Sequence, residues 1–190
     1  KRAQALAPGI AKNPDQLNRV IEAMASQELN AVWPFAQMLA TDLVNPLEAF
    51  AQAVAVLDAS GSRAGISFVR ALLSSLDRRF AQDADTNAKL IEIAESSTIL
   101  SQRPMDIYSS LRMTNVTIVI IAQQVREEKF GPFDVVPISY GNGLAGVPTS
   151  VLATLVDALI QRTKDGGAWA AIEILVMVTH GQGMLQPDVA

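Results

Sequence analysis

A short glycine-rich segment is the part of this chain whose residue spacing most closely matches a known ligand-binding pattern. Its sequence, GNGLAG, matches the pattern G-x-G-x-x-G through Gly141, Gly143 and Gly146. In a dinucleotide-binding fold such glycines let the backbone approach a pyrophosphate, whose charge is stabilised by the N-terminus of the following helix. The pattern predicts a nucleotide-binding site only if a strand precedes the segment and a helix follows it.

The flanking residues argue against that nucleotide site. Pro137 interrupts the apolar stretch that would be the strand, and Pro148 separates the last glycine from the helix expected near Thr149. Proline removes a hydrogen-bond donor from a strand. Residues 179–181, Thr-His-Gly, stand where an acidic residue should bind the ribose. We therefore favour a glycine-rich surface loop and predict no cofactor, and an α/β nucleotide-binding enzyme is the last alternative.

Arginines form the densest basic feature of a chain whose net charge is −4. Arg63, Arg70, Arg78 and Arg79 belong to the amphipathic segment 63–81, which we expect to be one helix. On a helix, Arg63 and Arg70 would share a side and could bind successive phosphates. Acidic neighbours and the helix dipole also explain arginines near a C-terminus. We favour a solvated helix face, and a nucleic-acid-coating protein remains the first alternative.

Few residues in this sequence could support metal binding or catalysis. There is no cysteine, and His180 is the single histidine. No carboxylate adjoins His180 to orient or tune its ring, as acid–base catalysis requires. The sequence therefore predicts no metal site and does not favour an enzyme.

The spacing of apolar residues predicts a mostly α protein, a globular bundle of several helices. Asn13 and Pro14, for example, form a typical helix start, because asparagine caps the first turn and proline has no N–H to leave unpaired. Two apolar segments, 116–122 and 172–178, fit either a short strand or a buried helix. The sequence leaves that choice open.

The composition changes near residue 114 and suggests two parts. We expect a helical part at 1–113 and a C-terminal part at 114–190, with one continuous domain as the alternative. The segment 130–148 is rich in glycine and proline and is predicted to be a long loop. Loops of this length in compact domains are usually functional or belong to a tail.

The chain is rich in apolar residues and poor in residues that could bind a metal or catalyse a reaction. This combination indicates a protein that binds other proteins. Hydrophobic residues make up 49% of the chain, and its mean hydropathy is +0.23. We predict a structural or interaction protein, a helical subunit of a shell, scaffold or oligomer that associates with itself. The loop would supply the contact residues, which are Phe130, Phe133, Tyr140 and Leu144.

The sequence does not identify the compartment of the chain, but it bears on membrane insertion and export. Its apolar runs are shorter than the roughly 20 residues that a membrane span needs, so we expect a soluble protein. The first residues do not resemble a signal peptide, because Pro8 and Gly9 interrupt the alanine-rich stretch after Lys1 and Arg2. Lysine rather than methionine at position 1 leads us to expect a fragment, a processed product or only part of the encoded protein.

Overall fold

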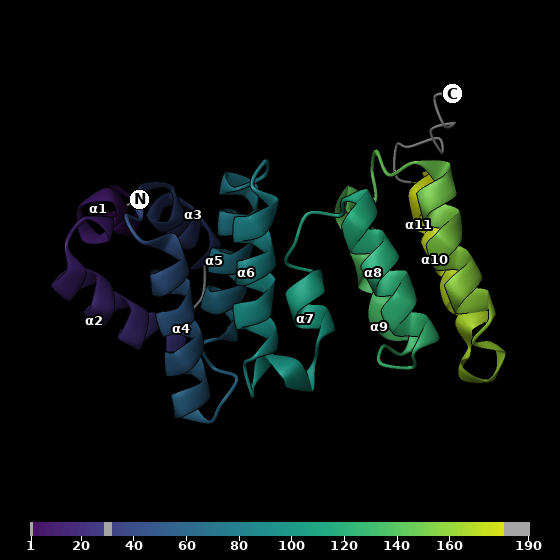
Figure 1. Cartoon of the computed structure of the whole chain (residues 1–190), viewed down its shortest axis with the longest axis horizontal. Helices are drawn as coiled ribbons and strands as arrows, with labels where there is room; N and C mark the ends of the chain where they lie inside the picture. The colour runs from purple at the N-terminus through teal and green to yellow at the C-terminus, as the bar shows by residue number, and fades with distance from the viewer. Residues whose placement is uncertain (1, 29–31, 181–190) are drawn as a thin grey trace. The chain divides into compact units, whose positions relative to one another are not determined.

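The computed structural model describes residues 2–28 and 32–180 and confirms the mostly α prediction (Figure 1). Within those ranges the chain forms eleven α-helices, three short 3₁₀ helices and no strand. Residues divide into two compact units, Lys1–Leu111 and Arg112–Ala190, which are called unit 1 and unit 2.

Unit 1 is built around a central amphipathic helix. Its elements are α1 (Arg2–Ala11), α2 (Pro14–Ala25), α3 (Val32–Asp42), α4 (Pro46–Ser60), α5 (Ile66–Arg79), α6 (Ala84–Glu95), the 3₁₀ helix η1 (Leu100–Gln102) and α7 (Met105–Tyr108). Helix α5 packs against α2, α3, α4, α6 and α7, and its side chains Phe68, Leu72 and Leu76 are fully buried or nearly so. The apolar stripe of α5 therefore forms the middle of the unit 1 core.

Local signals in the sequence explain where several of these helices begin and end. The side chain of Asn13 accepts a hydrogen bond from the amide of Gln16, so the predicted cap of α2 is confirmed. Asn45, in the same position before α4, instead donates its amide to Glu48. Helix α4 ends at Gly61, whose φ of +61° is a left-handed conformation that favours glycine.

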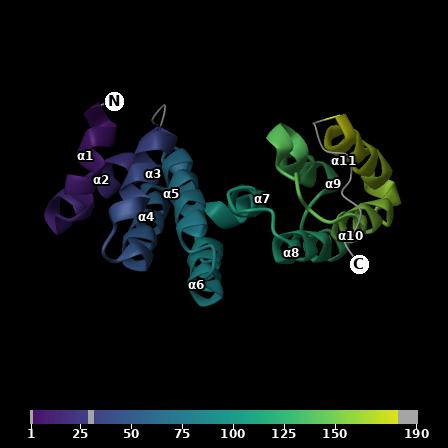
Figure 2. The same cartoon turned by 90° about the horizontal axis from the view of Figure 1, so that it is seen from above.

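Unit 2 is a smaller helical assembly. It contains α8 (Asn115–Arg126), α9 (Pro132–Val135), the 3₁₀ helix η2 (Val136–Asn142), α10 (Thr149–Ile160), the 3₁₀ helix η3 (Thr163–Asp165) and α11 (Gly167–His180). Helix α10 packs between α8 and α11, and α9 and η2 pack against α11 (Figures 1 and 2). This arrangement places one side of α11 in the core of the unit.

The possible strands at 116–122 and 172–178 are helices in the structure, so the strand alternative is wrong. Thr114 starts α8 by accepting a hydrogen bond from the amide of Thr117, and the buried residues of α8 then recur with helical spacing. Helix α11 begins after Gly166, whose φ of +78° turns the chain. Capping and the periodic burial of one side outweigh the weak strand preference of β-branched residues.

The predicted long loop at 130–148 is also partly wrong. It contains α9 and η2, which together span Pro132 to Asn142. Gly131 precedes α9, and its amide donates a hydrogen bond to the Asp134 carboxylate. Proline at the first helical position, followed by an acidic residue that binds the amide at the cap, is a standard helix start. The segment is a series of short turns packed on α11.

Candidate protein-docking surface

The glycine-rich segment lies among short helical turns, and the structure contradicts the strand–turn–helix context of a nucleotide site. Gly141 belongs to η2. A Cβ atom on Gly143 would lie 2.0 Å from the carbonyl oxygen of Ile138, and Gly146 has a φ of +82°. Both positions require glycine for the turn itself. Because the described ranges contain no strand, the local backbone alone accounts for these glycines.

Two of the four arginines that could have met phosphates bind a carboxylate inside unit 1. Arg63, in the turn before α5, forms an ion pair with Asp106 and donates to the carbonyl oxygen of Ile99 at 3.3 Å. Arg70 Nη1 lies 3.3 Å from the other oxygen of Asp106, and its Nε donates to Ser110 at 3.1 Å. Asp106 therefore joins α5 and its preceding turn to α7.

The remaining two arginines are at the C-terminal end of α5. Arg79 Nη1 donates to the carbonyl oxygens of Ala40 at 2.6 Å and Leu43 at 3.1 Å, and so binds the last turn of α3. Its guanidinium also lies 5.1 Å from the centre of the Phe80 ring. Arg78 is exposed. Three of the four arginines thus bind other groups of unit 1, and Arg79 is exposed like Arg78, so the role of this arginine face stays a prediction.

The four contact residues predicted in the 130–148 segment have different environments. Phe130 and Leu144 are buried in unit 2, which corrects their assignment to an exposed arm. Phe133 and Tyr140 are about half exposed. The Phe133 ring lies against Gly166, at the start of α11. Only Phe133 and Tyr140 can therefore take part in a docking surface without unfolding the segment.

A continuous apolar stripe covers the outer side of α11. Its side chains have exposed fractions of 71% at Trp169, 51% at Ile172, 44% at Val176 and 39% at Met177. The buried side of the helix consists of Gly167, Ala170, Ala171 and Ile174. At 3.6 residues per turn, Trp169, Ile172 and Val176 lie opposite that buried side. Helix α11 is therefore apolar on two opposite sides, of which one is uncovered.

Two residues from the preceding turns extend this stripe along one edge. Phe133 contacts Gly166, and the Tyr140 hydroxyl donates a 3.1 Å hydrogen bond to Glu173. That bond to the carboxylate raises the pKa of Tyr140 above its ordinary value. We use the name α11 surface for the exposed side chains of this stripe and its edge, which are Phe133, Tyr140, Trp169, Ile172, Val176 and Met177.

Sequence reasoning identified only part of this surface. Residues 169, 172, 176 and 179 follow the spacing +3, +4, +3, which is the signal for a second helix-packing seam. The sequence leaves segment 172–178 open between a short strand and a buried helix, and neither interpretation predicts an exposed apolar side. The sequence alone does not show which of the two apolar sides of α11 is packed against the other helices of unit 2.

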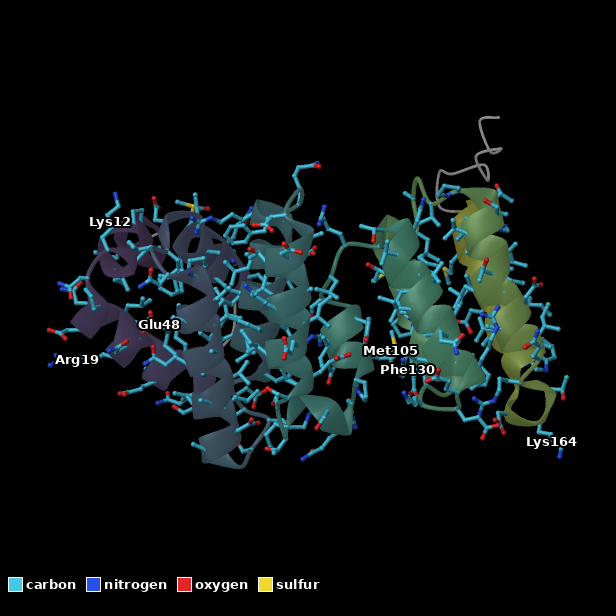
Figure 3. All side chains as sticks on the ribbon, viewed as in Figure 1. Lys12, Arg19, Glu48, Met105, Phe130 and Lys164 are labelled. Atoms are coloured by element: carbon cyan, nitrogen blue, oxygen red, sulfur yellow. The ribbon has the colours of Figure 1, made fainter. Side chains whose placement is uncertain are left out.

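A shallow cavity of about 420 Å³ lies in unit 1, where the turn between α1 and α2 meets the start of α4. Lys12 and Glu48, both exposed, bring one positive and one negative charge to its lining (Figure 3). The apolar part of the lining comes mainly from Ala11, Leu17, Val44 and Ala49. The Glu48 carboxylate already accepts a hydrogen bond from Asn45 at 3.1 Å.

Groups that could support metal or acid–base chemistry are not clustered in the described part of the chain. It contains no set of three or more His, Cys, Asp or Glu side chains arranged to hold a metal ion. His180, at the end of α11, has its Nδ1 atom 3.0 Å from the carbonyl oxygen of Val176. In residues 2–28 and 32–180, no helix combines the length and the apolar character needed to cross a membrane.

No protein-family model, curated protein sequence or solved structure matches this chain. The α11 surface is the largest group of exposed apolar side chains described above, and it is the basis for the proposed function.

Proposed function

We propose that this protein is a structural subunit of a larger protein assembly and that it contacts its neighbour through the α11 surface. The observation that carries the proposal is the exposure of Trp169 within a continuous apolar stripe on α11. Single exposed apolar side chains are normal, whereas a contiguous patch that includes tryptophan is typical of protein contacts. Tryptophan supplies a large contact area with few rotatable bonds.

The size of the stripe limits what the neighbour can be. Full burial of one large apolar side chain contributes about 1.5–3 kcal/mol, whereas association costs about 4–15 kcal/mol in lost freedom of motion. Several residues of the α11 surface must therefore be covered together. On α11 the stripe runs from Trp169 to Met177, so the neighbour must follow it for about 12 Å.

The charges around the stripe favour a protein neighbour over a lipid surface. A helix that lies on a membrane usually carries lysine and arginine on its polar side. The side of α11 opposite the stripe is packed in the core of unit 2, and Glu173 is the only Asp, Glu, Lys or Arg in the helix. An uncharged stripe of this kind fits another apolar protein surface.

The two tryptophans allow a direct test, because each unit contains one, Trp33 or Trp169. In a W33F chain, Trp169 alone reports on the α11 surface. We expect its emission to shift to shorter wavelength and its quenching by acrylamide to fall as the protein concentration rises. Light scattering should give a mass above the 20.3 kDa of one chain over the same range.

A pair of charged variants shows whether the α11 surface is responsible. I172E/V176E should remain a single chain with accessible Trp169 and unchanged far-ultraviolet circular dichroism. V116E/V119E is the matched control, because Val116 and Val119 on α8 are 68% and 48% exposed and lie outside the surface. It should assemble like the W33F chain. A W33F chain that stays monomeric with accessible Trp169, or equal loss of assembly in the control, would contradict the proposal.

A further inference from the structure

We infer that oxidation of Met177 to its sulfoxide by a peroxide weakens the contact between the α11 surface and its neighbour. The inference rests on the proposed function, since it names a regulation of the same surface. Methionine oxidation is reversible, because methionine sulfoxide reductases restore the thioether. The α11 surface therefore binds its neighbour with reduced Met177 and binds it weakly with oxidised Met177.

The composition of the chain directs peroxide chemistry to methionine. Cysteine and methionine are the side chains with an oxidisable sulfur, and this chain has six methionines and no cysteine. In the reaction a lone pair of the methionine sulfur attacks one oxygen of hydrogen peroxide, and the O–O bond breaks. That oxygen stays on the oxidised sulfur, and the other leaves as water. An apolar thioether thereby becomes a polar sulfoxide.

Exposure to solvent makes Met177 accessible to a peroxide in the free chain. Three of the five methionines in the described ranges are half-buried, whereas Met38 and Met177 are each 39% exposed. The sixth, Met184, lies outside those ranges. Met38 is on α3 in unit 1, so Met177 is the exposed thioether of the α11 surface. Equal exposure makes Met38 a matched reference for Met177.

The surroundings of Met177 cannot easily pair with a sulfoxide. Residues four apart on a helix are neighbours, which places Met177 beside Glu173. An ionised carboxylate only accepts hydrogen bonds, so Glu173 has none to offer the sulfoxide oxygen. The Tyr140 hydroxyl already donates to Glu173 at 3.1 Å. At this edge of the surface, water is therefore the hydrogen-bond partner of an oxidised Met177.

The sulfoxide weakens the contact because it must lose that water when the neighbour covers it. Transfer of an unpaired polar group out of water weakens binding by about fivefold or more. Leucine at the same position has a similar apolar volume and no sulfur. M177L therefore removes the oxidation without removing the apolar contact.

Association of W33F chains before and after mild treatment with hydrogen peroxide tests the inference. Light scattering and acrylamide quenching of Trp169 measure association, and peptide mass spectrometry measures oxidation at each methionine. Oxidised W33F should associate at least about fivefold more weakly, and sulfoxide reductases should restore it. W33F/M177L should associate equally before and after peroxide. W33F/M38L is the matched control and should lose association as W33F does.

Protection from peroxide gives a second, independent measurement. In dilute solution Met38 and Met177 should be oxidised at comparable rates, because they are equally exposed. As the W33F chain associates at higher concentration, oxidation of Met177 should slow while that of Met38 stays the same. An unchanged rate at Met177 across the association range would place it outside the contact and overturn the inference.

Two further outcomes would overturn the inference and leave the proposed function standing. The first is full association of W33F when Met177 is completely oxidised. The second is equal loss of association in W33F/M177L and W33F after the same treatment. A W33F chain that is monomeric before any peroxide is added contradicts the proposed function and this inference together.

Discussion

Ser97 Oγ donates a 2.7 Å hydrogen bond to Asp58 Oδ1, and this contact ties the end of α4 to the turn that follows α6. The same carboxylate accepts hydrogen bonds from the amides of Thr98 at 3.2 Å and Ile99 at 3.0 Å. Asp58 therefore acts as a cap for a turn about 40 residues further along the chain.

The Asp58 cap predicts a pH dependence for the stability of unit 1. Burial opposes the charged form, but the hydrogen bonds from Ser97, Ile99 and Thr98 outweigh it and lower the pKa of Asp58. A carboxyl with a lowered pKa in the folded state contributes stability above its ordinary pKa of about 3.9, and this contribution is lost as the pH falls through the folded value. D58N should reduce the free energy of unfolding by about 1–3 kcal/mol near neutral pH.

Urea unfolding of a W169F chain would check this prediction, since Trp33 then reports on unit 1 alone. The difference between the parent chain and D58N should be constant near neutral pH and shrink in acid below the ordinary pKa of aspartate. A difference that persists unchanged into strong acid would show that the Asp58 charge is not the cause.

Arg70 and Arg78 lie on the same helix but should respond differently to substitution. Arg70 binds Asp106 and Ser110, whereas Arg78 is exposed. R70A should lower the free energy of unfolding of unit 1 by about 1–2 kcal/mol. This value is smaller than for a buried charged hydrogen bond, because the side chains of Arg70 and Asp106 are partly exposed. R78A should change it by less than about 0.5 kcal/mol.

The Trp33 signal during urea unfolding again provides the measurement. Equal effects of R70A and R78A would mean that the Asp106 contacts are not stabilising.

The difference in stability between Arg70 and Arg78 variants also matters for any nucleic-acid binding assay. Loss of binding in a variant of Arg63 or Arg70 would have to be separated from loss of folded unit 1, whereas R78E tests charge with little effect on folding.

Phe130 and Phe133 are three residues apart and provide a second matched comparison. Phe130 is 2% exposed, so F130A should lower the stability of unit 2 by about 3–5 kcal/mol through lost burial and a residual cavity. Phe133 rests on Gly166 at the surface, so F133A should cost less than about 1 kcal/mol. Unfolding followed through Trp169 in a W33F chain checks both, and a similar cost for the two variants would contradict the assigned burial.

The helical class of this protein follows from sequence because its signals are local. Asn13 and Pro14 start α2 as predicted, since a cap and a proline act within one turn. The run from Val116 to Ile121 shows the limit of this reasoning. Six consecutive apolar or β-branched residues have no visible period, and only the Thr114 cap and tertiary packing decide that they form a helix.

The candidate site was harder to predict because it depends on long-range packing. Phe130 and Phe133 look equivalent in the sequence, yet the first is buried and the second exposed. Likewise, Arg70 appears to be a surface charge until Asp106, 36 residues later, is brought to it. The exposed side of α11 is determined by where α9, η2 and α10 pack on that helix, and no short sequence pattern encodes that choice.

Tyr140 gives a last prediction, which concerns the ionisation of its hydroxyl. That hydroxyl donates a hydrogen bond to the Glu173 carboxylate, and the bond raises the pKa of Tyr140 above its ordinary value. An amide in place of the carboxylate removes the negative charge that opposes the phenolate. E173Q should therefore lower the pKa of Tyr140 towards its ordinary value.

Spectrophotometric titration of the phenolate in a Y108F background measures this effect, because Tyr140 is then the single tyrosine of the chain. E22Q changes an exposed glutamate on α2 in unit 1 and is the control, which should leave the pKa of Tyr140 unchanged. An unchanged pKa of Tyr140 in E173Q would show that the Tyr140–Glu173 hydrogen bond does not control the ionisation of Tyr140.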